Sequence, residues 1–256
     1  MSDLTGKTAV VVGASRGLGR GIARAFAGAG AQVVAVARDG QALAELAASA
    51  NIRTEIGDAT EEAVAWSVLD QYAPEVVILV AGATPVMRSL QHQTWETFSV
   101  NWQADVKIAF GWLREALLQP LRPGSTVVVM SSGAAVNGSP ASGGYAGAKA
   151  TQRFIAEYAR DESRRAGLGI TVTAVLPRMT PAGAVGQRGI RAYAARGGQT
   201  EEEYLAAQGD LLTAETAGPR WWTWSGATWK RWLPVTCSPR PGCGNCRDRV
   251  NDAMEG

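Results

Sequence analysis

The sequence predicts an α/β fold: a doubly wound, mostly parallel sheet with helices on both faces, followed by an atypical C-terminal tail. Short runs rich in Val and Ile alternate with longer amphipathic segments, which is the pattern of strand–helix–strand crossover units. The chain has 256 residues, which is enough for one large domain and short for two. All its cysteines (Cys237, Cys243 and Cys246) fall in the tail, so we expect no disulfide framework in the body.

The expected strands are short and, apart from the weakest one, rich in Val and Ile, as strands buried on both faces are. They are residues 8–12, 32–37, 52–56 (the weakest), 76–80, 126–130 and 170–175. The expected helices lie between them, at residues 18–29, 41–50, 61–72, 95–118 and 145–165. Residues 133–144 are expected to form a loop, and residues 181–217 contain helix-like pieces at 189–195 and 200–208 without a strand.

The composition favours a small-molecule partner over a nucleic acid or a membrane. No apolar run approaches the length needed to span a bilayer. The net charge is +2, but the tail from Gly218 onward carries six Lys or Arg against three Asp or Glu, which leaves a nearly neutral body. The first residues lack the basic end and apolar core of a signal peptide, so we expect a cytoplasmic protein.

A glycine-rich turn follows the first expected strand and reads Gly13-Ala14-Ser15-Arg16-Gly17-Leu18-Gly19. Gly13 permits a tight exit from the strand, while Gly17 and Gly19 let the backbone approach a pyrophosphate. The following helix then presents free N–H groups to the anion. A turn without a ligand is the alternative, but its place between a strand and an amphipathic helix favours dinucleotide binding. The expected cofactor contacts are Gly13, Ser15, Arg16, Gly17, Leu18 and Gly19.

The Gly-x-x-x-Gly-x-Gly spacing resembles that of the short-chain dehydrogenase/reductase family, whose members have a Rossmann-type fold. The flanking Leu4-Thr5-Gly6-Lys7 and Arg20-Gly21-Ile22-Ala23 are similar to that family too, and the resemblance covers residues 4–217. It implies that Asp58 and Ala59 lie against the adenine, and that Ala81 and Gly82 lie under the cofactor. The family's usual pair of Asn before this Ala-Gly is Leu79-Val80 here.

The end of the second expected strand indicates which nicotinamide cofactor binds. An NAD site needs a carboxylate there to accept the ribose hydroxyls, but Ala37 takes that place. Arg38 follows, and Arg16 projects from the glycine turn, so two guanidinium groups are available for a 2′-phosphate. In the alternative interpretation both are solvated surface arginines, and Asp39 could form a salt bridge with Arg38. The pattern favours NADP(H).

The candidate catalytic residues are Asn101, Ser132, Tyr145 and Lys149. Tyr145 and Lys149 are four residues apart and therefore share one face of a helix. Such pairs are common, but Ser132 lies 13 residues before Tyr145, at the position of the family's catalytic serine. Asn101 lies where the family carries its fourth active-site residue. Taken singly, Asn101 could be a polar residue that bends a helix, and Ser132 a strand-end cap.

The resemblance implies a chemical role for each of these residues. The Lys149 ammonium, together with the positively charged oxidised nicotinamide, favours the phenolate form of Tyr145, which can then act as general acid in reduction and base in oxidation. Ser132 would donate a hydrogen bond to the substrate oxygen. Lys149 would also hold the nicotinamide ribose hydroxyls, and Asn101 would position a water that relays the proton.

The predicted function is therefore that of an oxidoreductase that moves a hydride between NADP(H) and a small carbonyl or alcohol substrate. Two alternatives remain open. One is a binding module that senses the redox state of NADP(H) without turnover. The other is an enzyme inactivated by its altered C-terminus.

The expected organisation is a catalytic domain over residues 1–217, with residues 177–217 on the substrate side, and a tail over residues 218–256. Five of the nine Trp lie in the tail, at positions 221, 222, 224, 229 and 232. One explanation is a divergent tail that buries its Trp cluster on the body or on a partner. The other is a reading-frame slip, because a shift of one nucleotide converts Trp-Trp-Thr-Trp into an amphipathic pattern.

We expect the tail to add no regular final strand to the sheet and to take no direct part in catalysis. In the family this region commonly packs against a neighbouring subunit, so the altered tail puts the typical homo-oligomer in doubt. We expect no metal site, since Cys237, Cys243 and Cys246 lack a fourth ligand nearby. The substrate-side segments carry mostly small and apolar residues, with no evident charged anchor.

Overall fold

The computed structural model describes residues 4–177, 181, 183–208, 224–225 and 228–229. In this part of the chain the central sheet has the strand order β3-β2-β1-β4-β5-β6, and every neighbouring pair in it is parallel. The strands are β1 (Thr8–Val12), β2 (Gln32–Ala37), β3 (Ile52–Ile56), β4 (Val76–Leu79), β5 (Thr126–Met130) and β6 (Thr171–Val175). The strand order reverses beside β1, which creates a crevice at the carboxyl ends of the strands.

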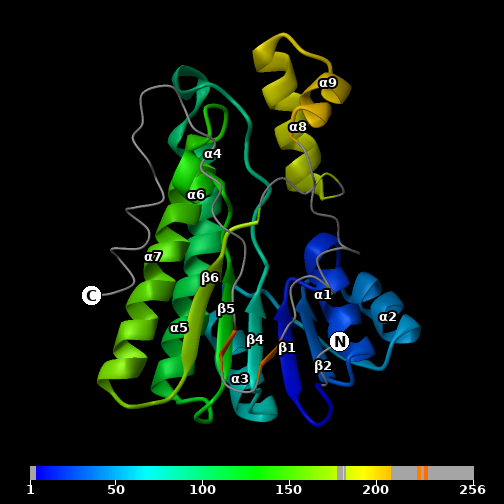
Figure 1. The fold of residues 1–256 in the computed structure, drawn as a ribbon, viewed down its shortest axis with the longest axis vertical. Helices are drawn as coiled ribbons and strands as arrows, with labels where there is room; N and C mark the ends of the chain where they lie inside the picture. Colours follow the sequence, from blue (N-terminus) through cyan, green and yellow to red (C-terminus); the bar gives the residue numbers. More distant parts are fainter. Residues whose placement is uncertain (1–3, 178–180, 182, 209–223, 226–227, 230–256) are drawn as a thin grey trace.

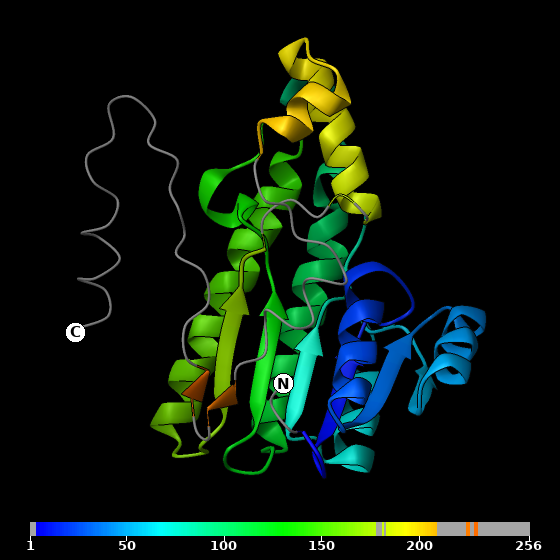
Figure 2. The same cartoon turned by 45° about the vertical axis from the view of Figure 1, so that its right-hand side comes forward.

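Helices cover both faces of this sheet, as Figures 1 and 2 show. The α-helices that pack on it are α1 (Gly17–Gly28), α2 (Gly40–Ser49), α3 (Glu62–Tyr72), α5 (Lys107–Leu118) and α7 (Gly143–Arg165). The others are η1 (Leu90–His92), α4 (Trp95–Asn101), η2 (Trp102–Val106), α6 (Ala134–Asn137), α8 (Ala184–Gly197) and α9 (Glu201–Ala206). Both α8 and α9 lie beyond the carboxyl ends of the strands, at the top of Figure 1. The predicted doubly wound Rossmann-type fold is confirmed.

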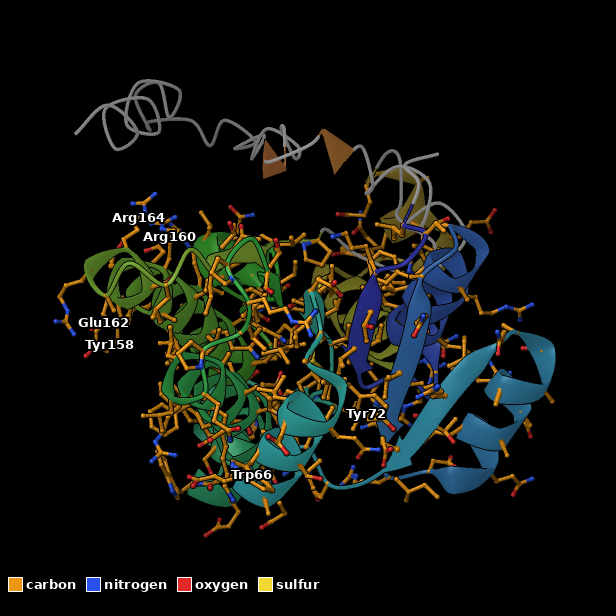
Figure 3. The ribbon with its side chains drawn as sticks, turned by 90° about the horizontal axis from the view of Figure 1, so that it is seen from below. Trp66, Tyr72, Tyr158, Arg160, Glu162 and Arg164 are labelled. Carbon is orange, nitrogen blue, oxygen red and sulfur yellow. The ribbon has the colours of Figure 1, made fainter. Side chains whose placement is uncertain are left out.

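Two apolar clusters, one on each face of the sheet, form the core. Successive side chains of a strand point to opposite faces, so Val10 and Val12 join the cluster under α3, α5 and α7, while Ala9 and Val11 join the cluster under α1 and α2. This is why the central strands β1, β4 and β5 are apolar at nearly every position. The outer sides of the helices face solvent, as Trp66 on α3 and Tyr158 on α7 show in Figure 3.

Most predicted elements match the observed ones to within one or two residues. Residues 95–118 are helical throughout, as predicted, but a π-helical turn, η2, separates α4 from α5. Wider turns of this kind often mark functional sites. Here the turn carries Asp105, whose side chain is buried at the carboxyl edge of the sheet. The loop predicted at residues 133–144 also contains the short helix α6.

Two short strands of the tail, β7 (Trp224–Ser225) and β8 (Thr228–Trp229), are described. They pair with each other, antiparallel, and within the described residues the main sheet ends at β6. The tail's cysteines and the tryptophans at 221, 222 and 232 lie outside the described residues. In the part of the chain that the structure covers, no helix is both long and apolar enough to cross a membrane.

Candidate active site

The glycine turn between β1 and α1 depends on close approaches of backbone to backbone. Gly13 has a φ of +92°, and a Cβ there would lie 2.6 Å from the amide nitrogen of Ala81. A Cβ on Gly19 would lie 2.2 Å from the carbonyl oxygen of Gly13. Gly17 has a φ of +54° and open space where its Cβ would be. The turn therefore excludes side chains at Gly13 and Gly19.

This turn leaves the N-terminus of α1 available to an anion. Arg16 occupies the N-cap position without forming a side-chain cap, and the first turn of the helix has no acidic residue. Ser15 is half-buried, and Arg16 and Gly17 are exposed. The helix α1 has 12 residues, and the free N–H groups at its N-terminus lie next to exposed backbone. Such N–H groups attract an anion and suit the pyrophosphate of a dinucleotide. The residues present thus fit a nicotinamide dinucleotide.

The predicted ribose end of the site lies at the carboxyl end of β2. Arg38 projects from it with 77% of its side chain exposed, and its Nη1 lies 3.6 Å from Oδ2 of Asp58. Asp39, considered above as a partner for Arg38, instead accepts a hydrogen bond from the amide of Ala42 at 3.0 Å and caps α2. Backbone and hydroxyl hydrogen bonds from Thr60, with a smaller contribution from Arg38, lower the pKa of Asp58.

The other predicted cofactor residues hold the surrounding backbone in place. The Ala59 carbonyl accepts a hydrogen bond from Nε1 of Trp112 at 3.0 Å. The Ala81 amide donates to the carbonyl of Val12 at 2.9 Å. Gly82 lies against Asp105, since a Cβ on Gly82 would lie 2.7 Å from that carboxylate.

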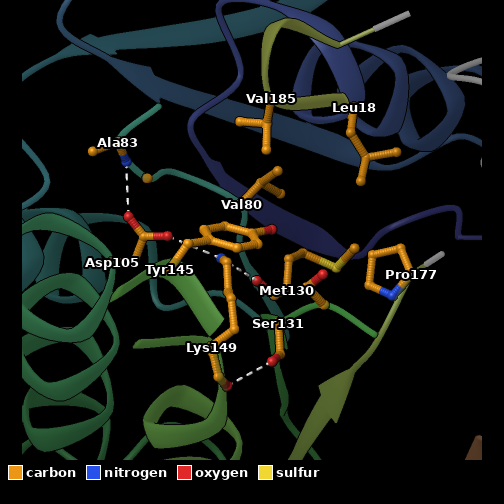
Figure 4. A pocket seen from close by; sticks show the side chains of 12 residues that line it. Leu18, Val80, Ala83, Asp105, Met130, Ser131, Tyr145, Lys149, Pro177 and Val185 are labelled. Atoms are coloured by element: carbon orange, nitrogen blue, oxygen red, sulfur yellow. Dashed lines mark hydrogen bonds and ion pairs between the residues drawn. The ribbon is translucent and has the colours of Figure 1, made fainter. Parts of the chain in front are cut away.

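A pocket at the carboxyl edge of the sheet brings together predicted residues from distant parts of the chain (Figure 4). Leu18 comes from the glycine turn, Ser132 follows β5, and Tyr145 and Lys149 lie on α7. The lining residues are Leu18, Val80, Gly82, Ala83, Asp105, Met130, Ser131, Ser132, Tyr145, Lys149, Pro177 and Val185. The pocket therefore joins the expected cofactor turn to three of the four candidate catalytic residues.

Lys149 is buried behind Tyr145, and its ammonium lies 5.5 Å from the centre of the tyrosine ring. Its Nζ lies 3.1 Å from Oδ2 of Asp105 and donates to the carbonyl of Met130 at 3.0 Å. It also donates to Oε1 of Gln152 at 2.9 Å. Burial opposes the charged form of Lys149, but the negative charge and hydrogen bond of Asp105, together with the contribution of Tyr145, outweigh burial and raise the pKa of Lys149.

The two serines after β5 have different surroundings. Ser131 is buried, and its hydroxyl donates to the carbonyl of Lys149 at 2.7 Å. Ser132 is half-buried, and its Oγ accepts from the amide of Ala134 at 3.2 Å. That bond leaves the hydroxyl proton of Ser132 available, which suits the predicted role of a donor to substrate.

Asn101 lies behind the pocket and is only 1% exposed. Its Nδ2 donates to the carbonyl of Ala83 at 2.8 Å and to Oδ1 of Asp105 at 3.2 Å. Because both neighbours are acceptors, the amide nitrogen must face them. Its Oδ1 is buried and has no hydrogen-bond partner among the described residues.

Sequence reasoning missed Asp105 and Gln152, which link these residues. Asp105 lies four residues after Asn101, and Gln152 lies three after Lys149. Both spacings put a polar side chain on the same helix face as a candidate catalytic residue, and this signal could have found them.

Comparison with known proteins identifies the family. The model of the short chain dehydrogenase family matches residues 7–191. The chain belongs to the short-chain dehydrogenase/reductase family. The members of this family are oxidoreductases that use a nicotinamide cofactor.

Curated members of the short-chain dehydrogenase/reductase family resemble the chain at moderate identity. Hydroxynaphthalene reductase-like protein Arp2 of Metarhizium robertsii is 30% identical over 192 residues, covering 68% of this chain and 68% of the relative. Short chain dehydrogenase/reductase dpmpG of Macrophomina phaseolina is 32% identical over 152 residues, covering 54% of this chain and 86% of the relative.

Solved structures share the fold at lower identity. NAD+-bound xylitol dehydrogenase has a TM-score of 0.68 at 22% identity, covering 80% of this chain and 84% of that one. A putative short chain dehydrogenase from Escherichia coli CFT073 has a TM-score of 0.62 at 23% identity, with coverages of 69% and 82%.

Proposed function

We propose that this protein is an NADP(H)-dependent oxidoreductase that transfers a hydride between the cofactor and a small carbonyl or alcohol substrate. The observation that carries the proposal is the shared pocket, in which Ser132, Tyr145 and Lys149 meet Leu18 of the glycine turn. A sensing module needs the cofactor cradle, but it does not need a proton donor beside the cofactor.

Each side chain of the pocket has a defined task in the proposed reaction. The bound nicotinamide supplies or accepts the hydride. Tyr145 gives its phenolic proton to the substrate oxygen during reduction and takes it back during oxidation. Ser132 donates a hydrogen bond to the same oxygen, where negative charge develops. The Lys149 ammonium lies 5.5 Å from the ring centre, so its positive charge faces the side chain that would exchange the proton.

Asn101 serves this reaction from behind the pocket. Its amide nitrogen is held by Ala83 and Asp105, so its orientation is fixed. Its buried Oδ1 lacks a partner among the described groups. A buried acceptor of this kind suits the proposed proton-relay water, because buried polar atoms are rarely left unpaired.

The preference for NADP(H) rests on the surroundings of the adenosine ribose. Ala37 offers no carboxylate to the ribose hydroxyls, and the Asp39 carboxylate is engaged in capping α2. Arg16 and Arg38 are both exposed, and Arg38 follows the carboxyl end of β2. Their guanidinium groups can bind a 2′-phosphate, for which Arg is well suited.

The pocket walls favour an uncharged, largely apolar substrate. Leu18, Val80 and Met130 form part of the lining, together with Pro177 and Val185 from the segment beyond β6. Lys149, the cationic group of this lining, is already paired with Asp105. The hydroxynaphthalene reductase-like relatives make bicyclic aromatic ketones a natural part of any substrate panel.

The test is to measure NADPH binding and NADPH oxidation on the same sample, with a panel of aliphatic and bicyclic aromatic ketones and aldehydes. Turnover with any member supports the proposal. Tight NADPH binding without turnover across the panel would favour the redox-sensing module instead. Failure of both binding and turnover would favour the inactivated enzyme.

A further inference from the structure

A buried carboxylate lies directly behind the candidate catalytic lysine. The Asp105 side chain is 1% exposed and that of Lys149 is 7% exposed, and their charged atoms are 3.1 Å apart. A buried charge is costly unless it is paired and hydrogen-bonded. The other oxygen of Asp105 accepts from the Ala83 amide at 2.7 Å and from Asn101 at 3.2 Å. Both oxygens of the carboxylate are therefore used within the site.

The carboxylate is also held in place from the other sides. Nε2 of Gln152 donates to the backbone carbonyl of Asp105 at 2.8 Å, which ties η2 to α7. Gly82 packs against the carboxylate so closely that a Cβ would be 2.7 Å from it. Asp105 thus sits in a site shaped around it, not on a free helix surface.

The lysine has no unused donor in this arrangement. An ammonium group has three N–H bonds, and those of Lys149 are directed at Asp105, the Met130 carbonyl and Gln152. A hydrogen bond to the nicotinamide ribose, which the family resemblance implies, would require one of these three to be exchanged. Without such an exchange Lys149 acts on Tyr145 through its charge.

The positive charge of Lys149 is partly balanced by the carboxylate of Asp105. Among the described residues, the titratable groups that face Lys149 are Asp105 from η2 and Tyr145 from α7. Met130 on β5 and Gln152 on α7 offer neutral acceptors. The tyrosine therefore experiences an ion pair and not an isolated cation, and the field of a pair falls off faster than that of a single charge.

We propose that Asp105 is a positioning residue of the active site: it fixes the Lys149 ammonium beside Tyr145 and limits how strongly that cation stabilises the phenolate. This rests on the proposed function only where turnover is concerned, since the ion pair can be tested without it. Loss of the carboxylate frees more positive charge to act on Tyr145. It also leaves the buried ammonium uncompensated, so Lys149 gives up its proton more easily.

The first experiment follows Lys149 directly. The chain has four lysines (Lys7, Lys107, Lys149 and Lys230), so carbon-13 labelling of lysine gives few NMR signals, and Lys149→Met identifies the one of interest. In Asp105→Asn, Lys149 should titrate at lower pH than in the unaltered protein. Asp105→Glu keeps a carboxylate and should return the titration of Lys149 most of the way to that of the unaltered protein. An unchanged Lys149 titration in Asp105→Asn overturns the proposal.

A matched control is available on α5. Glu115 is also a buried acid, 7% exposed, but its partner is Arg114. Glu115→Gln removes a buried carboxylate without touching the pocket, so the titration of Lys149 should stay where it is. A shift as large as that of Asp105→Asn would overturn a specific role for Asp105.

A double-mutant cycle of melting temperatures tests the ion pair even if the single variants are less stable. Removing one partner of a buried pair leaves the other unpaired, whereas removing both does not. The double variant Asp105→Asn/Lys149→Met should therefore melt at a higher temperature than either single variant. Additive losses of melting temperature would contradict the pairing.

The second experiment uses turnover. In Asp105→Asn the pH–rate profile for alcohol oxidation should move to lower pH by about one unit on both limbs. The acid limb moves because the phenolate is better stabilised, and the alkaline limb moves because Lys149 loses its proton earlier. A uniform fall in rate with no movement of the profile would indicate a merely structural role and overturn the proposal. If the unaltered protein turns over no substrate, the proposed function fails. The NMR titration of Lys149 and the double-mutant cycle of melting temperatures then still decide the role of Asp105.

Discussion

The glycine turn after β1 and the polar cluster behind Tyr145 lie at the same edge of the sheet, yet they are built in opposite ways. The turn uses seven consecutive residues, exposes backbone, and works through the absence of side chains at Gly13 and Gly19. The cluster uses side chains from η2 and α7, together with backbone of β5, and buries two opposite charges. One is specified locally, and the other exists only once the chain is folded.

This difference indicates which substitutions should disrupt the glycine turn and which should disrupt the polar cluster. In the turn, an added methyl group at Gly13 or Gly19 collides with backbone, and we expect the loss in cofactor binding. In the cluster, a lost polar group leaves its partner buried and unpaired, and we expect the loss in stability and, through Tyr145, in proton transfer. The predictions below separate the two halves.

The largest expected effect is on proton transfer. Tyr145→Phe should lower kcat by about 10³-fold, because it removes the proton donor and keeps the ring. The affinity for NADPH, measured by fluorescence titration, should hardly change. Tyr158→Phe, on the exposed side of the same helix, is the matched control and should leave both quantities unaltered. Near-normal turnover in Tyr145→Phe would refute the assignment.

The two serines should separate catalysis from stability. Ser132→Ala should lower kcat by about 10²-fold, since it removes a donor to the developing alkoxide. Ser131→Ala loses a buried hydrogen bond to the carbonyl of Lys149 and should cost about 1 kcal/mol of unfolding free energy. Steady-state kinetics and urea denaturation of both variants would check this. The opposite pattern would show that Ser131 is the catalytic serine.

The glycine turn should respond in cofactor affinity. Gly19→Ala should weaken NADPH binding by about tenfold or more, because its Cβ would lie 2.2 Å from the Gly13 carbonyl and force the turn open. Gly28→Ala, in the same helix with open space around its Cβ, is the control and should bind NADPH normally. Isothermal titration calorimetry measures both. Equal affinities for the two variants would remove the turn from the cofactor site.

The smallest expected effect is on cofactor preference. Arg38→Asp should reduce the ratio of kcat/KM for NADPH over NADH by about tenfold, since an anion replaces a phosphate-binding guanidinium. Arg24→Asp makes the same charge change on an exposed position of α1 and should leave the ratio unaltered. Equal use of NADPH and NADH by the unaltered protein would contradict the proposed preference.

Several features of the candidate site could be predicted from the sequence because they depend on local spacing. The glycines of the turn, the Tyr145–Lys149 pair and the serine ahead of it follow from short intervals along the chain. The strands could be predicted because apolar side chains are required on both faces of a covered parallel sheet. The π-helical turn could not be predicted from this spacing, and its flanking side chains Asn101 and Asp105 are bound to the distant Ala83.

The sequence by itself determined the doubly wound fold, the glycine turn after β1 and the choice of candidate catalytic residues, because periodicity and short-range motifs encode them. Only the tertiary structure decided that Ser131, and not Ser132, donates its hydroxyl to the backbone of α7. The tertiary structure also decided that Arg38 pairs with Asp58 and that a buried carboxylate pairs with Lys149. Asp105 and Lys149 are 44 positions apart, and their charges interact strongly only because folding removes both from water. Burial and long-range contact are properties of the folded chain, so linear spacing carries little information about them.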